Sequence, residues 1–75
     1  MKYKAWRSHT DKNMHVVCRD GDFENLPQRI RSLGPWSGSR EGEIDKLKLH
    51  YRLQIIEQGF TIVHRHVLAF SLEHD

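Results

Sequence analysis

A single cysteine, Cys18, occurs among the 75 residues of the chain, so no disulfide can cross-link one molecule internally. The fold must therefore depend on its apolar core. Surface scaling predicts that a chain of this length buries only about 60% of the surface that it exposes when unfolded. Domains of this size often gain stability from a partner. We predict a single domain over residues 1–75 with a thin core.

The lone thiol also predicts where the protein resides, because secreted domains of this size are usually rich in disulfides. The first residues show no apolar run of the kind found in secretory signals. No stretch approaches the roughly 20 apolar residues that a membrane-spanning helix needs. We therefore expect a cytoplasmic protein that makes no membrane contact.

Strand-like patterns occur near both ends of the chain. Near the N-terminus, residues 2–7 and 14–19 flank the turn-forming segment 9–13, and together they predict a β-hairpin. Residues 60–66 are rich in β-branched and aromatic side chains, so they predict a third strand. Residues 67–72 either extend that strand or form a helix, and the sequence leaves both open.

A short helix is predicted between these strands. Leu26, Ile30 and Leu33 recur at the i, i+4 and i+7 spacing of one helical face. The helix should end at Gly34, because glycine readily adopts the left-handed conformation at a helix end. Pro35 cannot continue the helix, which strengthens this boundary.

A second, longer helix is predicted to begin after a serine cap at Ser37 or Ser39 and to end at Gly59. Its apolar residues form two stripes on nearly opposite sides of the helix. The first stripe contains Ile44, Leu47, Tyr51 and Ile55. The second stripe contains Leu49, Leu53 and Ile56.

The resulting element order, ββααβ, predicts an α+β domain. We expect about three strands in an antiparallel or mixed sheet, covered on one face by the two helices. One sheet cannot cover both stripes of the second helix. The second stripe is therefore predicted to meet the first helix within the chain, which is the favoured alternative, or else a protein partner or the same stripe in a homodimer. Our leading functional prediction is a non-catalytic protein-interaction module that uses Leu49, Leu53 and Ile56.

Basic and aromatic residues at the start of the chain suggest a second function. Lys2, Lys4, Trp6 and Arg7 have the composition of a strand on which single-stranded RNA stacks. However, the 12 Lys and Arg residues are scattered and are nearly balanced by 10 Asp and Glu residues, which leaves a net charge of +2. This balance permits weak nucleic-acid binding without predicting it.

The glycine- and serine-rich segment 34–40 suggests a third function, a site for a small anionic ligand. Backbone N–H groups at a helix start can bind an anion, and an arginine and a tryptophan are available to contact it. The candidate ligand-binding residues are Trp36, Ser37, Ser39 and Arg40. The lysine of a phosphate-binding loop is missing. Helix capping by the serines and packing of Trp36 in the core are therefore the favoured interpretation.

No pattern predicts catalysis, a metal or a cofactor. His64 and His66 share one face of a strand, but a zinc site needs three or four ligands. The sequence does not show whether Cys18 or His50 lies near them. Cys18 lies between apolar residues of a strand, so we expect a core position rather than a nucleophile. We therefore expect that the protein is not an enzyme.

Residues 33–43, together with 50–52 and 58–60, resemble small uncharacterised bacterial proteins. These residues read Leu-Gly-Pro-Trp-Ser-Gly-Ser-Arg-Glu-Gly-Glu, His-Tyr-Arg and Gln-Gly-Phe. The resemblance covers the middle third to half of the chain. It implies a bacterial cytoplasmic protein, and no activity accompanies it.

Overall fold

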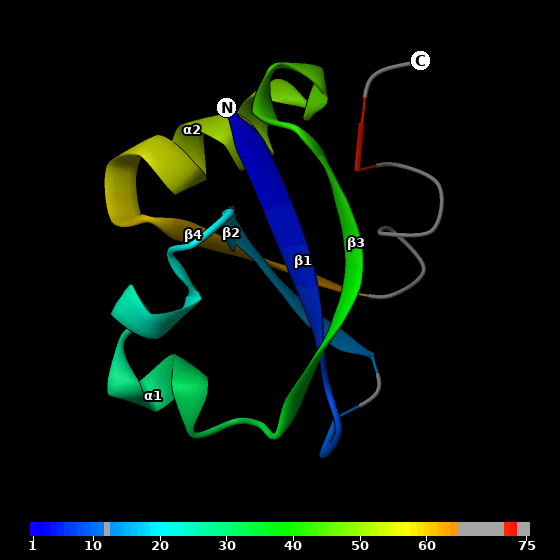
Figure 1. The fold of residues 1–75 in the computed structure, drawn as a ribbon, viewed down its shortest axis with the longest axis vertical. Coiled ribbons are helices and arrows are strands. Elements are labelled where there is room, and N and C mark those ends of the chain that lie inside the picture. The colour runs from blue at the N-terminus through cyan, green and yellow to red at the C-terminus, as the bar shows by residue number, and fades with distance from the viewer. Residues whose placement is uncertain (12, 65–71, 74–75) are drawn as a thin grey trace.

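The structure is a computed structural model that describes residues 1–11, 13–64 and 72–73. Four strands and two helices, with two short 3₁₀ turns, make up these residues (Figure 1). In chain order they are β1 (Lys2–Ser8), β2 (Met14–Arg19), the turn η1 (Phe23–Asn25), α1 (Gln28–Arg31), β3 (Trp36–Glu43), the turn η2 (Ile44–Lys46), α2 (Leu49–Gln58) and β4 (Phe60–His64).

The strands form one antiparallel sheet in the order β3-β1-β2-β4, so the N-terminal strand lies inside the sheet (Figure 1). The predicted hairpin is confirmed, with Arg7 opposite His15 on β1 and β2. The predicted three-stranded sheet in the order ββααβ is wrong, because β3 is a fourth strand between the helices. Residues 67–72, for which a strand extension and a helix were both left open, lie outside the described residues except for Leu72.

Strand β3 occupies the segment in which the sequence predicts the serine cap and the start of the second helix. Its residues contain no helical apolar stripe and include two glycines, so local helix propensity is low. Pairing with β1 supplies the backbone hydrogen bonds that the segment needs. Trp6 lies opposite Gly38 and Ala5 lies opposite Arg40, so Ser39 is the extra residue of a β-bulge.

Helix α2 begins later than predicted, at Leu49, because Ile44 and Leu47 enter the core from η2 and the residue that follows it. The predicted end of the helix is confirmed. Gly59 has a φ of 92°, a left-handed conformation that favours glycine, and its N–H donates to the Ile55 carbonyl. No helix in the described part of the chain is long and apolar enough to cross a membrane.

Two apolar clusters lie on opposite faces of the sheet, because neighbouring side chains of a strand point to opposite sides. The cluster beneath α2 contains Tyr3, Ala5, Val17, Ile44, Leu47, Tyr51, Ile55, Val63 and Leu72. The cluster beneath α1 contains Val16, Cys18, Leu26, Ile30 and Phe60, with Trp6, Phe23 and Trp36 packed against it.

The prediction that both helices cover one face is therefore wrong. Val16 and Val17 are adjacent on β2 and are both fully buried. Such a strand needs cover on both faces, and α1 and α2 supply it from opposite sides.

The segment Leu72–Glu73 closes the α2 side of the core. Leu72 is buried, and its carbonyl accepts a hydrogen bond of 3.0 Å from the Lys48 N–H. The Tyr3 hydroxyl donates to the Glu73 carboxylate. Burial and this carboxylate raise the pKa of Tyr3 well above its usual value, so the hydroxyl stays protonated. Gly42 makes room for the contact, because a Cβ there would lie 2.7 Å from Glu73 Oε2.

Candidate functional site

Three large apolar side chains are exposed along α2, and we call them the outer face of α2. They are Leu49, Leu53 and Ile56, which are 53%, 44% and 62% exposed. They belong to the i, i+4, i+7 pattern of one helical face. They form the longest run of exposed large apolar residues on any single element of the described chain.

The outer face is exposed because the opposite side of the helix is the one that meets the sheet. Tyr51 and Ile55 are buried, and their mean direction lies about 150° around the helix axis from the outer face. The expectation that the first helix covers this stripe within the chain is wrong. Helix α1 packs on the other face of the sheet, beneath which Val16 and Cys18 are buried.

Polar side chains flank the outer face on both sides. The helical period places His50 and Glu57 along one side, and both are exposed; the His50 ring centroid lies 4.0 Å from that of Tyr51. Lys48 and Arg52 lie along the other side, where Arg52 Nη1 donates to the Asp45 carbonyl at 3.4 Å. The surface therefore has an apolar centre with a polar rim, the usual arrangement in protein interfaces.

The four predicted ligand-binding residues do not converge on one site. Trp36 lies on the α1 side of the sheet, where its Nε1 donates to the Arg31 carbonyl at 3.2 Å. Ser37 and Arg40 lie on the α2 side, opposite Arg7 and Ala5 of β1. Ser39 is at the bulge. The helix start that was to bind the anion is absent here, because α2 begins at Leu49.

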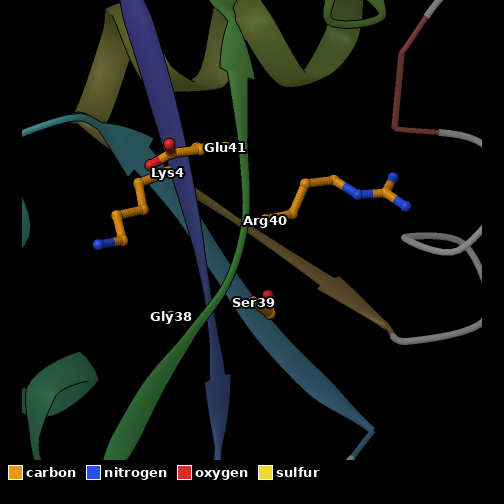
Figure 2. Close-up of a pocket in the computed structure, with 5 residues that line it drawn as sticks. All are labelled: Lys4, Gly38, Ser39, Arg40 and Glu41. Carbon is orange, nitrogen blue, oxygen red and sulfur yellow. The ribbon is translucent and has the colours of Figure 1, made fainter.

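A shallow hollow of about 280 Å³ lies over β1 and β3. Lys4, Gly38, Ser39, Arg40 and Glu41 line it. Figure 2 shows Lys4 and Glu41 on the same side of the ribbon, while Arg40 points to the other side. Lys4 and Glu41 are directly opposite in the strand pairing, so the hollow is lined by residues of both charges.

The predicted nucleic-acid residues are divided between the two faces of β1. Lys2, Lys4 and Trp6 share one face, whereas Arg7 lies on the other. Glu43 and Glu41 lie opposite Lys2 and Lys4 across the β1–β3 pair. The ring centroids of Trp6 and Phe23 are 4.3 Å apart. Lys4 Nζ lies 4.6 Å from the centroid of the Trp6 ring.

Two buried titratable groups lie on β2. His15 is 4% exposed, its Nδ1 has no hydrogen-bond partner, and burial followed by the Arg7 charge lowers its pKa. Cys18 is fully buried as expected, and burial, followed by the Asp22 charge, raises the pKa of its thiol to about 11. A protonated, inaccessible thiol is unsuited to nucleophilic chemistry.

The described residues contain no cluster of three metal-ligating side chains. His64 is exposed, and His66 lies outside the described residues.

Sequence reasoning missed one polar pair, the hydrogen bond between His9 Nε2 and Ser37 Oγ. The two residues are 28 positions apart, and only the β1–β3 pairing joins them. Both side chains lie at the surface, and no carboxylate among residues 1–11, 13–64 and 72–73 bonds to the imidazole.

No protein-family model, curated protein or solved structure matches the chain. The resemblance to small bacterial proteins therefore stays a prediction.

Proposed function

We propose that the protein is a non-catalytic interaction module and that the outer face of α2 is its binding surface. The observation that carries the proposal is the exposure of Leu49, Leu53 and Ile56 on one face of a helix whose other face is fully engaged. Covering such a side chain contributes roughly 1.5–3 kcal/mol when it is completely buried. Because the three residues are already about half covered, a partner that covers all of them gains about half of that sum, or roughly 2–5 kcal/mol.

The size of the domain strengthens the proposal. A domain of this length has a small net stability, commonly about 5–15 kcal/mol, and its largest exposed apolar patch is often functional. The other two hypotheses receive less support, because Lys2 and Lys4 lie opposite Glu43 and Glu41 in the strand register and the predicted anion site has no helix start. A buried, unpaired Cys18 fits a reducing compartment such as the cytoplasm.

Site-specific photo-crosslinking in living cells tests the proposal. A benzophenone amino acid replaces Ile56 on the outer face, and in a matched variant it replaces Leu33, which is 38% exposed and lies after α1. We expect a discrete adduct from position 56 and none from position 33. Addition of Leu53→Asp to the first variant should abolish the adduct, because the charge disrupts the centre of the surface.

Both variants must show the circular dichroism spectrum of the unmodified protein. The proposal fails if position 56 gives no adduct, or if positions 56 and 33 give the same products.

A further inference from the structure

We infer that the partner of this surface is a second copy of the chain, bound about a two-fold axis with the two α2 helices antiparallel. The inference rests on the proposed function, because it names the occupant of the same surface. It is carried by two features, the spacing of the apolar residues along the helix and the position of two charged or polar groups beside them.

The apolar residues suit an antiparallel copy. Leu49 and Ile56 are seven positions apart, about 10.5 Å along the axis, and Leu53 lies between them. In an antiparallel two-fold pair, Leu49 lies opposite the partner's Ile56, and Leu53 lies next to the axis. The same three residues of each molecule therefore form the contact with the other molecule.

The polar rim has the same symmetry. His50 and Glu57 are also seven positions apart and lie on the same side of the outer face. An antiparallel two-fold pair brings that side against itself, so His50 lies beside the partner's Glu57, and this occurs twice in the dimer. An imidazole N–H or imidazolium is a donor, and a carboxylate is an acceptor. A parallel pair instead places His50 level with Lys48 and Arg52 of the other helix, which offer no acceptor.

The outer face is small for a dimer interface. It presents three apolar residues that are each about half exposed, whereas a standard interface buries roughly 800 Å² per partner. The dimer should therefore be weak and should form only as the concentration rises.

Sedimentation equilibrium of the full chain tests the inference. We expect the mass to rise from monomer toward dimer between about 10 µM and about 1 mM, the range of a weak interface. Leu53→Asp should remain monomeric throughout, and so should Ile56→Lys, which guards against an effect peculiar to one variant. Leu33→Asp adds the same charge to an exposed leucine outside the surface, and it should associate as the wild type does.

Charge exchange tests the antiparallel arrangement. His50→Glu and Glu57→Lys should each weaken the dimer by about 2- to 30-fold, the range expected from two exposed ion pairs. The double variant again places opposite charges beside each other across the axis, so its dissociation constant should return to within about threefold of the wild type. Failure of the double variant to recover overturns the antiparallel arrangement.

Two other outcomes overturn the inference. One is a wild type that stays monomeric at every concentration while position 56 crosslinks to a different protein in cells, in which case the proposed function stands and the second copy is wrong. The other is a dimer that survives Leu53→Asp but is lost in Ile62→Lys. That result would assign association to the outer edge of β4.

Discussion

At the scale of single residues, His15 is the side chain whose protonation is most constrained by the fold. It is buried on β2, opposite Arg7 of β1 and Val63 of β4. Burial disfavours the imidazolium, and the Arg7 charge disfavours it further, while a backbone contact with Val63 offsets part of the decrease in pKa. The folded protein therefore holds this histidine neutral to a lower pH than the unfolded chain does.

Protein stability should consequently fall on the acid side of neutrality. Above the ordinary histidine pKa of 6.5, both states of the chain carry neutral His15, so the residue adds no pH dependence. Below pH 6.5, His15 of the unfolded chain binds a proton, whereas His15 of the folded chain stays neutral. The free energy of unfolding therefore decreases as the pH falls, until the lowered pKa of the folded state is reached. Urea unfolding between about pH 7.5 and pH 5 measures this slope.

The variant His15→Phe should have a smaller slope than the wild type over that range. The matched variant His64→Gln alters an exposed histidine and should keep the wild-type slope. Equal slopes for His15→Phe and the wild type would show that another group is responsible.

At the scale of elements, the two edge strands differ in their protection against pairing with another sheet. Strand β3 carries a bulge at Ser39 and three charged residues, Arg40, Glu41 and Glu43. Strand β4 reads Phe-Thr-Ile-Val-His, with neither bulge nor formally charged Asp, Glu, Lys or Arg residue, and Ile62 is 36% exposed. Bulges and charges are the usual devices that prevent edge-to-edge aggregation. The residues of β4 therefore protect their edge against pairing with another sheet less well than those of β3 do.

The variant Ile62→Lys should slow aggregation on heating, because it places a charge on the unprotected edge. The free energy of unfolding should change by less than about 1 kcal/mol, since the side chain is partly in water already. Light scattering at a fixed temperature below the unfolding transition measures the rate. Ser39→Lys on β3, the edge strand with the bulge and the charges, is the control and should leave the aggregation rate unchanged. An equal effect of both variants would show that net charge is responsible instead.

At the scale of the whole molecule, the sheet separates two cores that should contribute independently. Ile30 is buried in the cluster beneath α1, and Ile55 is buried in the cluster beneath α2. Truncation of either buried isoleucine to alanine costs roughly 2–5 kcal/mol. Substitutions without shared contacts usually add to within about 0.5 kcal/mol.

The double variant Ile30→Ala/Ile55→Ala should therefore lose about 4–10 kcal/mol, most of the stability of a domain of this size. Urea unfolding of both single variants and the double variant gives the three values, and the double variant should be largely unfolded in buffer. A double variant only as unstable as the worse single variant would mean that the two cores are coupled through the sheet.

Local patterns in the sequence determined several parts of this protein correctly. The alternation in residues 2–7 and 14–19 predicted the hairpin, and the β-branched run after Gly59 predicted β4. The end of α2 was also predictable, because only glycine readily adopts the conformation with a φ of 92° found there. Within α2, the separation of the buried Tyr51 and Ile55 from the exposed outer face follows from the helical period. In each case, a single short segment holds the necessary information.

The other features of the fold and of the candidate site depend on tertiary contacts. Trp36–Glu43 has weak local preferences, and it becomes a strand because β1 offers it an edge that closes the sheet. The four predicted ligand-binding residues are separated for the same reason, since a strand sends alternate side chains to opposite faces. The outer face of α2 is a candidate site because α1 covers the other side of the sheet. Hydrophobic periodicity shows which residues share a face, but the identity of what covers that face depends on contacts between distant segments.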